Sequence, residues 1–447
     1  MPFKSCLLLT VASLALAACA ADKADAPVSV AMGLNPTLEK PESSLIPTLK
    51  VAEATGWPAG AAPTAAAGLT VKAFATGLDH PRWLHVLPNG DVLVAETNAP
   101  KRPDEGKGIR GYFMGQAMKK AGAAAPTPNR IMLLRDADGD GVAETKSEFL
   151  TGLNSPFGMA LANGRLYIAN TDAVVSVPYK VRDTKITATP VKLTDLPAGT
   201  RNHHWTKSLI ASKDGSKLYA TVGSNSNIGE NGLAVEEGRA AIWEIDVATG
   251  QKRLFATGLR NPNGLSWEPK TGALWTAVNE RDELGHNLVR DYITSVKDGA
   301  FYGWPWSYYG QTVDTRVKPA NPEMVAKAIK PDYATGAHTA SLGLTFATGA
   351  RLGDQFREGA FIGQHGSWNR NPFSGYKVIF VPFANGMPSG EAVDVLTGFV
   401  DKDDKARGRP VGVAIAGDGS LLVADDVGNA IWRVSSGRAG EAAVAAK

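Results

Sequence analysis

Cysteine is nearly absent from this sequence, which has only Cys6 and Cys19 among 447 residues. The Cys-x-x-Cys-His signature of covalent haem attachment is missing, so electrons from any redox chemistry would have to leave through a separate carrier. A strong charge of either sign is missing too, because 47 Lys and Arg stand against 44 Asp and Glu, a net +3 at pH 7. No basic run with interleaved aromatic residues is present, and nucleic acid is therefore not an expected partner.

Long hydrophobic runs are also lacking. The apolar stretch from Leu7 to Leu16 is too short to span a bilayer as a mature helix. It leads into Leu-Ala-Ala-Cys19, which resembles the lipobox of a bacterial lipoprotein, and the alanine that follows suits the outer membrane of a diderm cell. We expect residues 1–18 to be a signal peptide and the protein to be a periplasmic or cell-envelope lipoprotein anchored through Cys19. An ordinary signal peptide with an incidental cysteine is the alternative.

The rest of the chain divides by composition. Residues 19–68 are rich in Ala, Pro and small polar residues and show little strand-like alternation. We expect a tether followed by an N-terminal extension, and the sequence leaves open whether residues 33–60 pack on the domain. Residues 69–436 carry a repeated pattern, and the Ala-rich residues 437–447 are expected to be a frayed tail.

The repeated pattern is a strand, a tight turn that usually contains Asn-Gly or Asp-Gly, and a second apolar strand that usually ends in a polar residue. Asn-Gly and Asp-Gly provide the positive φ angles that a two-residue hairpin requires. Six copies begin about 66 residues apart on average and span Gly77–Glu96, Gly152–Asn170, His204–Gly223, Gly258–Glu280, Ser341–Gln364 (the most degraded) and Gly408–Asp425.

Repeated hairpins of this kind predict an all-β fold in which six four-stranded antiparallel blades surround a channel, that is, a six-bladed β-propeller. A four-stranded blade needs roughly 40–50 residues. The surplus is therefore expected in long loops between strands, and no substantial helix is expected after the signal peptide. An open solenoid of the same units is the structural alternative.

Polar residues that flank the hairpins are the candidates for chemistry, because in a propeller they gather at the channel mouth. His203 and His204 precede the third hairpin, and a histidine suits a general base because its pKa lies near neutrality. A histidine that is merely hydrogen-bonded in a loop is the alternative. Zinc is not indicated, since no third ligand stands at a useful spacing.

The fourth hairpin opens with Arg260 and Asn261, a pair that can polarise a carbonyl or hold an anion. The hairpin is followed by an acidic loop at 279–287 and by residues 298–305. Carboxylates, an amide and loop carbonyls at this density are typical of a hard-cation site. A solvated loop would have the same composition, so both readings stay open.

A second candidate for calcium is the sequence Asp136-Ala-Asp138-Gly-Asp140-Gly, which matches the start of a calcium-binding loop. The twelfth position, where a bidentate Glu is expected, is Ser147, and Glu148 comes one residue later. No helix precedes the loop. A structural calcium site and a polar hairpin between outer strands are both compatible with this pattern.

Cations accumulate near the last two hairpins. Arg370, Lys377, Arg407 and Arg409 would converge on the mouth once the chain closes into a ring. Several cations around one pocket imply a multiply anionic small ligand. As surface charges they would need no special explanation, which is the alternative for Lys377 above all.

Taken together, these motifs carry a family resemblance over residues 68–434. Arg-Asn-Pro-x-Gly-Leu with the acidic loop and Tyr-Gly-Trp-Pro, His-Trp-Thr, His-Gly-Ser-Trp-Asn-Arg and Gly-Arg-Pro-Val-Gly-Val resemble the quinoprotein glucose/sorbosone dehydrogenase superfamily. The resemblance is closest to its sorbosone dehydrogenase-like and pyranose dehydrogenase-like branch. It implies a six-bladed propeller that oxidises a sugar with pyrroloquinoline quinone and calcium and passes the electrons to an external acceptor.

The resemblance also implies roles for individual residues. His204 is similar to the family's base, and Arg260 and Asn261 match the pair that holds the quinone oxygens. Calcium would be held by the loop at Glu280, Arg281 and Asp282, through backbone carbonyls at the first two. The remaining cofactor-binding expectations are Asn225 beside the base, and Arg370 or Lys377 with Arg407 and Arg409 on the cofactor carboxylates.

This chain departs from the family pattern in three respects. His203 replaces the acidic residue that precedes the base in glucose-oxidising members, the acidic loop is shorter, and only one of Arg407 and Arg409 aligns with a paired arginine. Two other functions stay open: a propeller that binds a ligand or protein without catalysis, and a calcium-dependent lactone hydrolase.

Overall fold

The structure is a computed structural model that describes residues 23–42 and 48–437. The expected signal peptide, Cys19 and most of the expected tail lie outside the described residues. None of the helices in these two stretches is long and apolar enough to cross a membrane.

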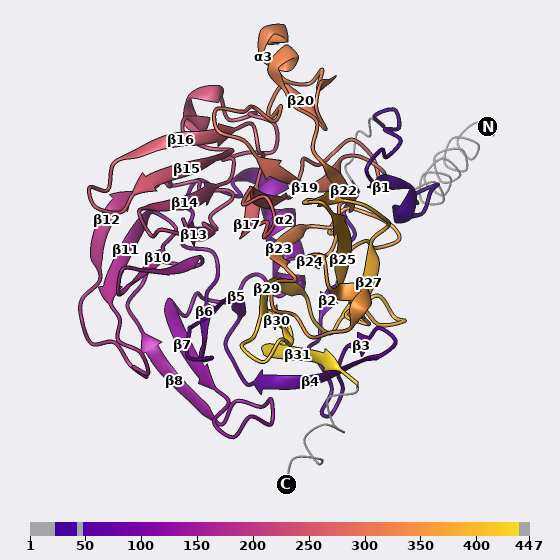
Figure 1. The fold of residues 1–447 in the computed structure, drawn as a ribbon. Helices are drawn as coiled ribbons and strands as arrows, with labels where there is room; N and C mark the ends of the chain where they lie inside the picture. Colours follow the sequence, from indigo (N-terminus) through magenta and orange to yellow (C-terminus); the bar gives the residue numbers. More distant parts are fainter. Residues whose placement is uncertain (1–22, 43–47, 438–447) are drawn as a thin grey trace, which may run out of the picture.

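Six antiparallel sheets are arranged in a ring, which confirms the predicted six-bladed β-propeller (Figure 1). The blades contain, from the channel outwards, these strands: in blade 1, β5 (Pro81–Val86), β6 (Val92–Glu96), β7 (Arg130–Arg135) and β8 (Thr145–Leu150); in blade 2, β9 (Met159–Ala162), β10 (Arg165–Ala169), β11 (Ala173–Pro178) and β12 (Val191–Asp195); in blade 3, β13 (Leu209–Ala211), β14 (Lys217–Val222), β15 (Ala241–Asp246) and β16 (Lys252–Thr257).

The second half of the ring follows the same plan. Its strands are, in blade 4, β17 (Pro262–Trp267), β18 (Leu274–Val278), β19 (Arg290–Val296) and β22 (Tyr333–Ala337); in blade 5, β23 (Ser341–Phe346), β24 (Gly359–Gln364), β25 (Lys377–Ala384) and β27 (Val393–Thr397), with β26 (Met387–Pro388) beside β25; in blade 6, β29 (Pro410–Ile415), β30 (Leu421–Asp425), β31 (Ala430–Ser436) and β4 (Leu69–Thr76). Blade 6 is therefore closed by a strand from the beginning of the domain.

Each of the six repeats forms the inner two strands of one blade, and the predicted turn chemistry operates there. Between β9 and β10, Asn163 and Gly164 have φ values of 50° and 70°, the conformation that a tight hairpin requires. Glycines on the inner strands allow neighbouring blades to approach. A Cβ at Gly158 would lie 2.2 Å from the Leu209 nitrogen, and one at Gly343 would lie 2.2 Å from the Val411 oxygen.

The surplus residues lie in insertions, as expected, but one of these contains a helix that the sequence analysis did not predict. Helix α2 (Gly108–Lys120) lies between β6 and β7. Its two internal glycines and weak apolar periodicity explain why the sequence did not indicate it. The insertion between β19 and β22 holds β20 (Ser307–Tyr308), β21 (Thr312–Val313) and α3 (Pro322–Lys327), and three 3-10 turns occur elsewhere, at Val28–Ala31, Leu233–Glu236 and Asp354–Phe356.

The N-terminal extension packs against the later blades over its described length. Its strand β1 (Met32–Gly33) pairs with β22, and β3 (Thr64–Ala65) pairs with β27. A further strand, β2 (Glu53–Ala54), runs parallel to β28 (Lys405–Ala406) just before blade 6. The described parts of the extension therefore belong to the folded unit, and they include Ala24, whose amide donates to the Asn371 carbonyl at 2.7 Å.

We expect Ile431→Ala to lower the free energy of unfolding by about 2–5 kcal/mol, the usual cost of a cavity at a buried aliphatic residue. Ile431 is fully buried in β31, opposite Ala75 of the ring-closing strand. The matched control is Val393→Ala on the outer strand β27, which is 42% exposed and should change stability by no more than about 0.5 kcal/mol. Urea unfolding of the two variants measures the difference, and equal losses would contradict the assigned ring closure.

Candidate active site at the channel mouth

One face of the ring gathers the ends of the repeated hairpins, because every inner strand starts there and every second strand ends there. His204 lies ahead of β13, Asn261 ahead of β17 and Arg409 ahead of β29, while Glu280 and Asp426 follow β18 and β30. We call this end of the channel the mouth.

His204 is held at the mouth in a defined protonation state. Its Nδ1 lies 2.9 Å from the Ser224 carbonyl oxygen, which can only accept, so Nδ1 carries the proton. Burial is the main cause that lowers the pKa of His204 well below its usual value, and the neighbouring His203 and Arg260 act in the same direction. Among the described residues none hydrogen-bonds to Nε2, so this atom presents a free lone pair. A neutral imidazole with a free Nε2 is the form that a general base needs.

The Asn261 amide lies directly beside His204. A Cβ at Gly223 would come within 2.5 Å of both Asn261 Oδ1 and His204 Cβ, so only glycine lets these two side chains meet. Asn261 Oδ1 is buried, and none of the described residues donates a hydrogen bond to it. Asn225, predicted to stand beside the base, accepts a 3.1 Å hydrogen bond from the His203 amide and so holds the backbone ahead of His204.

Arg260 joins this group to the acidic loop. Its guanidinium is 2% exposed and donates to the Glu280 carbonyl at 2.6 Å and to Asp282 Oδ2 at 3.1 Å. Asn369 donates to Asp282 Oδ1 at 2.8 Å, and His338 Nδ1 lies 3.5 Å from the same oxygen. Burial opposes ionisation of Asp282, but His338 and Arg260 outweigh it and lower the pKa of the carboxyl. The predicted residues Arg260, Asn261, Glu280 and Asp282 thus lie together.

Arg281 does not bring its side chain to the mouth. Its side chain is fully buried and points into the β19–β22 insertion, where it donates to the carbonyls of Pro305 at 2.7 Å and Ser307 at 2.6 Å. It also pairs with Asp314 at 3.2 Å. This side chain therefore anchors the insertion.

A second charged cluster lies at the mouth where blade 6 meets blade 1. Asp426, 1% exposed, accepts from His365 Nε2 at 2.9 Å and lies 3.3 Å from Arg82 Nη1 and 3.6 Å from His80 Nε2. Burial would raise the pKa of Asp426, but His365, His80 and Arg82 lower it strongly. Arg409 donates to the Tyr376 hydroxyl at 2.6 Å. The Nε atoms of Arg82 and Arg409 are buried and find no acceptor within residues 23–42 and 48–437.

Arg82 connects the two clusters. Its guanidinium carbon lies 5.6 Å from the centre of the Trp205 ring and 5.9 Å from that of Phe157. Trp205 follows His204 in the chain, so Arg82 links the blade 6 cluster to the segment that carries the base.

The structure does not bring the other predicted cations to the mouth. Arg370 donates to the backbone carbonyls of His286, Pro372 and Ala26, so it fastens the N-terminal extension to blade 5. Lys377 pairs with Asp394 on the outer strand β27 at 2.7 Å. Arg407 has a 37% exposed side chain and lies 3.8 Å from Asp401. Of the four predicted late cations, only Arg409 is in place.

Several residues of the mouth were not predicted, although the repeats contain a signal for one of them. Arg82 follows the start of the first hairpin, and Asp426 follows the second strand of the last, where the pattern usually has a polar residue. Comparing equivalent positions in the copies would have found Asp426, whereas the position of Arg82 is occupied by Phe157 and Val411 in other copies and carries no such signal. His338 and Asn369 lie outside the repeated hairpins, and no such signal marks them. Lys207 is fully buried, and its Nζ donates to the carbonyls of His204 and Trp205 at 3.3 and 3.2 Å, which fixes the backbone that carries the base.

Comparison with known proteins agrees with this geometry. The TrAA12-like family matches residues 129–296 and 311–437. The chain belongs to this family. Among curated relatives, the pyrroloquinoline quinone-dependent pyranose dehydrogenase of Coprinopsis cinerea is 24% identical over 430 residues, covering 82% of this chain and 53% of that protein. An uncharacterised protein of Borreliella burgdorferi is 27% identical over 296 residues, covering 63% of this chain and 76% of its own length. These matches confirm the predicted quinoprotein sugar dehydrogenase superfamily.

Solved structures share the fold of this TrAA12-like chain. A Trichoderma reesei family AA12 structure has a TM-score of 0.67 at 20% identity and covers 87% of this chain and 99% of that chain. The holo form of the pyranose dehydrogenase PQQ domain from Coprinopsis cinerea has a TM-score of 0.66 at 21% identity, covering 86% and 100%. The chain thus spans about half of the full curated Coprinopsis protein but the whole of its PQQ domain.

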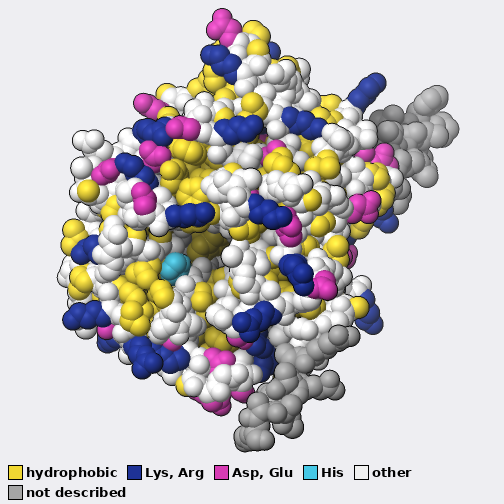
Figure 2. All heavy atoms as spheres, viewed as in Figure 1, with side chains coloured by type: hydrophobic (Ala, Val, Ile, Leu, Met, Phe, Trp, Pro, Cys, Tyr) yellow, Lys and Arg dark blue, Asp and Glu magenta, His cyan; other side chains and the backbone are white. Residues whose placement is uncertain are grey.

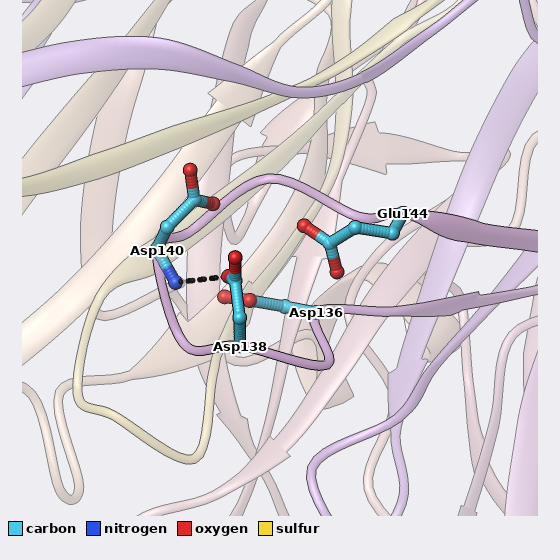
Figure 3. A group of neighbouring side chains, drawn as sticks. All are labelled: Asp136, Asp138, Asp140 and Glu144. Atoms are coloured by element: carbon cyan, nitrogen blue, oxygen red, sulfur yellow. Dashed lines mark hydrogen bonds between the residues drawn. The ribbon is translucent and has the colours of Figure 1, made fainter.

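The Asp136 loop lies at the opposite end of its blade, because β7 leads away from the mouth. One oxygen from each of Asp136, Asp138, Asp140 and Glu144 lies within 4.8 Å of the others (Figure 3). Glu144, at the ninth loop position, was missed because the pattern directed attention to the twelfth. The carboxylates accept hydrogen bonds from the loop's own backbone amides, such as those of Gly139 and Gly141 on Asp136. The predicted calcium site at Asp136, Asp138 and Asp140 stays a prediction, and its position excludes a catalytic role.

A cavity of about 500 Å³ lies further along the channel, between the middle and the far ends of the inner strands. Figure 2 shows a central hollow on one face of the ring, with hydrophobic side chains inside it and a histidine and basic side chains near its edge. His85 is the one titratable residue among those that line the cavity. Because it offers no set of charged groups, this cavity is a poorer place for anionic ligands than the mouth.

His85 predicts a pH dependence of stability. Burial lowers the pKa of His85 to about 4 from an ordinary 6.5. Below pH 6.5, His85 is therefore protonated in the unfolded chain but stays neutral in the folded protein until the pH approaches 4. Stability should therefore fall between pH 6.5 and 4, by at most about 3 kcal/mol from this residue. His85→Gln should remove that part of the loss in urea unfolding at pH 7 and 4.5. Lys213→Gln, at an exposed turn, should keep the wild-type pH dependence, and an identical loss in both variants would count against the assignment.

Proposed function

We propose that this protein is a sugar dehydrogenase that uses pyrroloquinoline quinone, with His204 as the base that takes the proton from the sugar hydroxyl. The observation that carries the proposal is the state of His204: neutral, fixed through Nδ1, and with Nε2 free at the mouth. A purely ligand-binding propeller would not require such a base beside unpaired buried donors and acceptors.

The polar atoms left without partners fit the proposed cofactor. Asn261 Oδ1 and the Nε atoms of Arg82 and Arg409 are all buried, have no hydrogen-bond partner among the described residues, and belong to side chains at the mouth. Such atoms are costly unless a ligand satisfies them. When bound, the quinone supplies the acceptor for the hydride. We propose that Arg82 and Arg409 hold its carboxylates and that Arg260 and Asn261 face its quinone oxygens.

Calcium fits the acidic side of the mouth. Asp282 provides a carboxylate, Glu280 a carbonyl, and Asn369 a buried Oδ1 that accepts from no residue in the described part of the chain. Together they make a set of hard oxygen ligands. We propose that these groups hold the ion, which would polarise an oxygen as a Lewis acid. Since Arg260 donates to the Glu280 carbonyl, it would have to give up that contact to the metal.

The remaining work of the protein is positioning and proton transfer. The Ser224 carbonyl keeps the His204 ring oriented, and Lys207 holds the backbone on which the ring stands. When Nε2 takes the hydroxyl proton, the resulting cation has a low pKa and readily returns the proton to solvent. We propose an aldose or a sorbosone-like ketoaldehyde as substrate. We also propose an external electron acceptor, because the sequence has no haem-attachment motif.

We expect His204→Asn to lower kcat by about 10²–10⁴, the usual contribution of a general base. Binding of pyrroloquinoline quinone, followed by absorbance titration, should be unchanged. The assay is sugar-dependent dye reduction by the protein reconstituted with and without calcium, over a panel of aldoses, ketoses and sorbosone. The matched control is His85→Gln, a histidine of the same channel far from the mouth, which should retain full activity. Lactone hydrolysis without quinone binding would replace the dehydrogenase by the lactonase, and quinone binding without turnover would favour the binding propeller.

We also propose that the protein is exported and anchored through Cys19, which rests on the lipobox-like sequence alone. Cells expressing the full chain should incorporate a labelled fatty acid into it and retain it in the membrane fraction. Cys19→Ser should abolish both. Equal labelling of the two proteins would contradict the anchor.

A further inference from the structure

The insertion that leaves blade 1 between β6 and β7 crosses the mouth. At its near end, the Asp104 amide donates to the Thr200 carbonyl of blade 3 at 3.2 Å, and Arg102 donates to the His203 carbonyl at 2.9 Å. Past α2, Gly122 packs against Ala54 and Val427 beside blade 6. Residues 97–129, which we call the bridging segment, therefore reach from blade 3 to blade 6 over the site.

The bridging segment places the Glu105 carboxylate beside His203, the residue that precedes His204 in the chain. Glu105 Oε1 lies 2.5 Å from His203 Nδ1, and Arg201 lies 3.5 Å from the other carboxylate oxygen. Burial opposes ionisation of Glu105, but His203 and Arg102 outweigh it and lower the pKa of the carboxyl. Glu230 is a second acid near His203, but its oxygens accept the amides of Asn227 and Ile228. Glu105 is thus the acid that bonds to His203.

The hydrogen bond to Glu105 determines which ring nitrogen of His203 carries a proton. A carboxylate accepts only, so Nδ1 of His203 donates to it and the neutral ring has its lone pair at Nε2. None of the described residues hydrogen-bonds to that Nε2. The side chain is 36% exposed, and its ring meets that of His204 edge to face with 4.5 Å between centroids. Two neighbouring imidazoles therefore present free Nε2 atoms at the mouth.

We propose that Glu105 and His203 form a substrate-binding dyad, in which Nε2 of His203 accepts a hydrogen bond from the sugar hydroxyl next to the one deprotonated by His204. His203 contacts the sugar, and Glu105 is a positioning residue that acts through it. In glucose-oxidising members the residue before the base is acidic, and here that position is His203. Glu105, which comes from the bridging segment of another blade, therefore supplies an acidic group next to this position. This inference rests on the proposed function for its substrate.

The kinetic test compares an aldopyranose with its 2-deoxy analogue in the reconstituted full chain. Glu105→Gln should lower kcat/KM for the aldopyranose by about 10- to 100-fold, mainly through KM, because a charge-assisted hydrogen bond to bound substrate is weakened. For the 2-deoxy analogue, which lacks the contacted hydroxyl, the change should stay below about threefold. Glu105→Asp should recover part of the loss. The matched control is Asp104→Asn, the neighbouring carboxylate that pairs with Lys107, which should behave as wild type with both sugars.

A second measurement does not depend on turnover. In ¹⁵N-histidine spectra of the cofactor-free protein, a Nδ1-protonated signal assigned to His203 by its loss in His203→Asn should be present in wild type and Asp104→Asn. It should disappear or broaden in Glu105→Gln. Absence of the signal from wild type overturns the dyad even if no sugar is oxidised, whereas failure to bind quinone overturns only the proposed function. Equal losses for both sugars in Glu105→Gln would also overturn the proposal, since Glu105 would then act on the fold alone.

Discussion

The antiparallel pairing of β4 with β31 is the constraint on which the site depends. It runs from Ala430 opposite Thr76 to Ser436 opposite Leu69 and joins the two ends of the domain in one blade. The same closure brings Arg82 of blade 1 within 3.3 Å of Asp426 of blade 6. Residues separated by most of the chain thus form one charged cluster, and the mouth exists only in the closed ring.

Most charged side chains at the mouth are paired with a group of opposite charge or with a histidine. Asp282 and Asp426 are both buried deeply enough that ionisation would be unfavourable, yet nearby cations and histidines lower the pKa of each. These pairs are tied into hydrogen-bond networks, which is what makes buried charge tolerable. The Nε donors of Arg82 and Arg409 have no partner among the described residues, and an anionic ligand of the kind proposed would satisfy them. His204 stays neutral in the same field, because burial and neighbouring positive charge both disfavour its cation.

The sequence was sufficient to predict the ring because each hairpin carries its own local signal: turn chemistry, alternation and a closing polar residue. His204, Arg260 and Asn261 could be predicted because they occupy fixed places relative to that signal. Arg370 had no such relation to a hairpin. Its guanidinium is taken up by backbone carbonyls, including that of Ala26 in an extension whose docking no local pattern indicated. Glu105 was missed for a related reason, since it reaches His203 across the mouth from an insertion with weak helical periodicity. Contacts between distant segments depend on the path of the insertions, which local patterns do not encode.

The most direct test of the account is a crystal structure of the protein loaded with pyrroloquinoline quinone and calcium. The account predicts the cofactor in the mouth, with its carboxylates on Arg82 and Arg409, Asn261 no longer unpaired, and His204 Nε2 facing the substrate side. A mouth without cofactor, or a cofactor bound in the apolar cavity around His85, would contradict it.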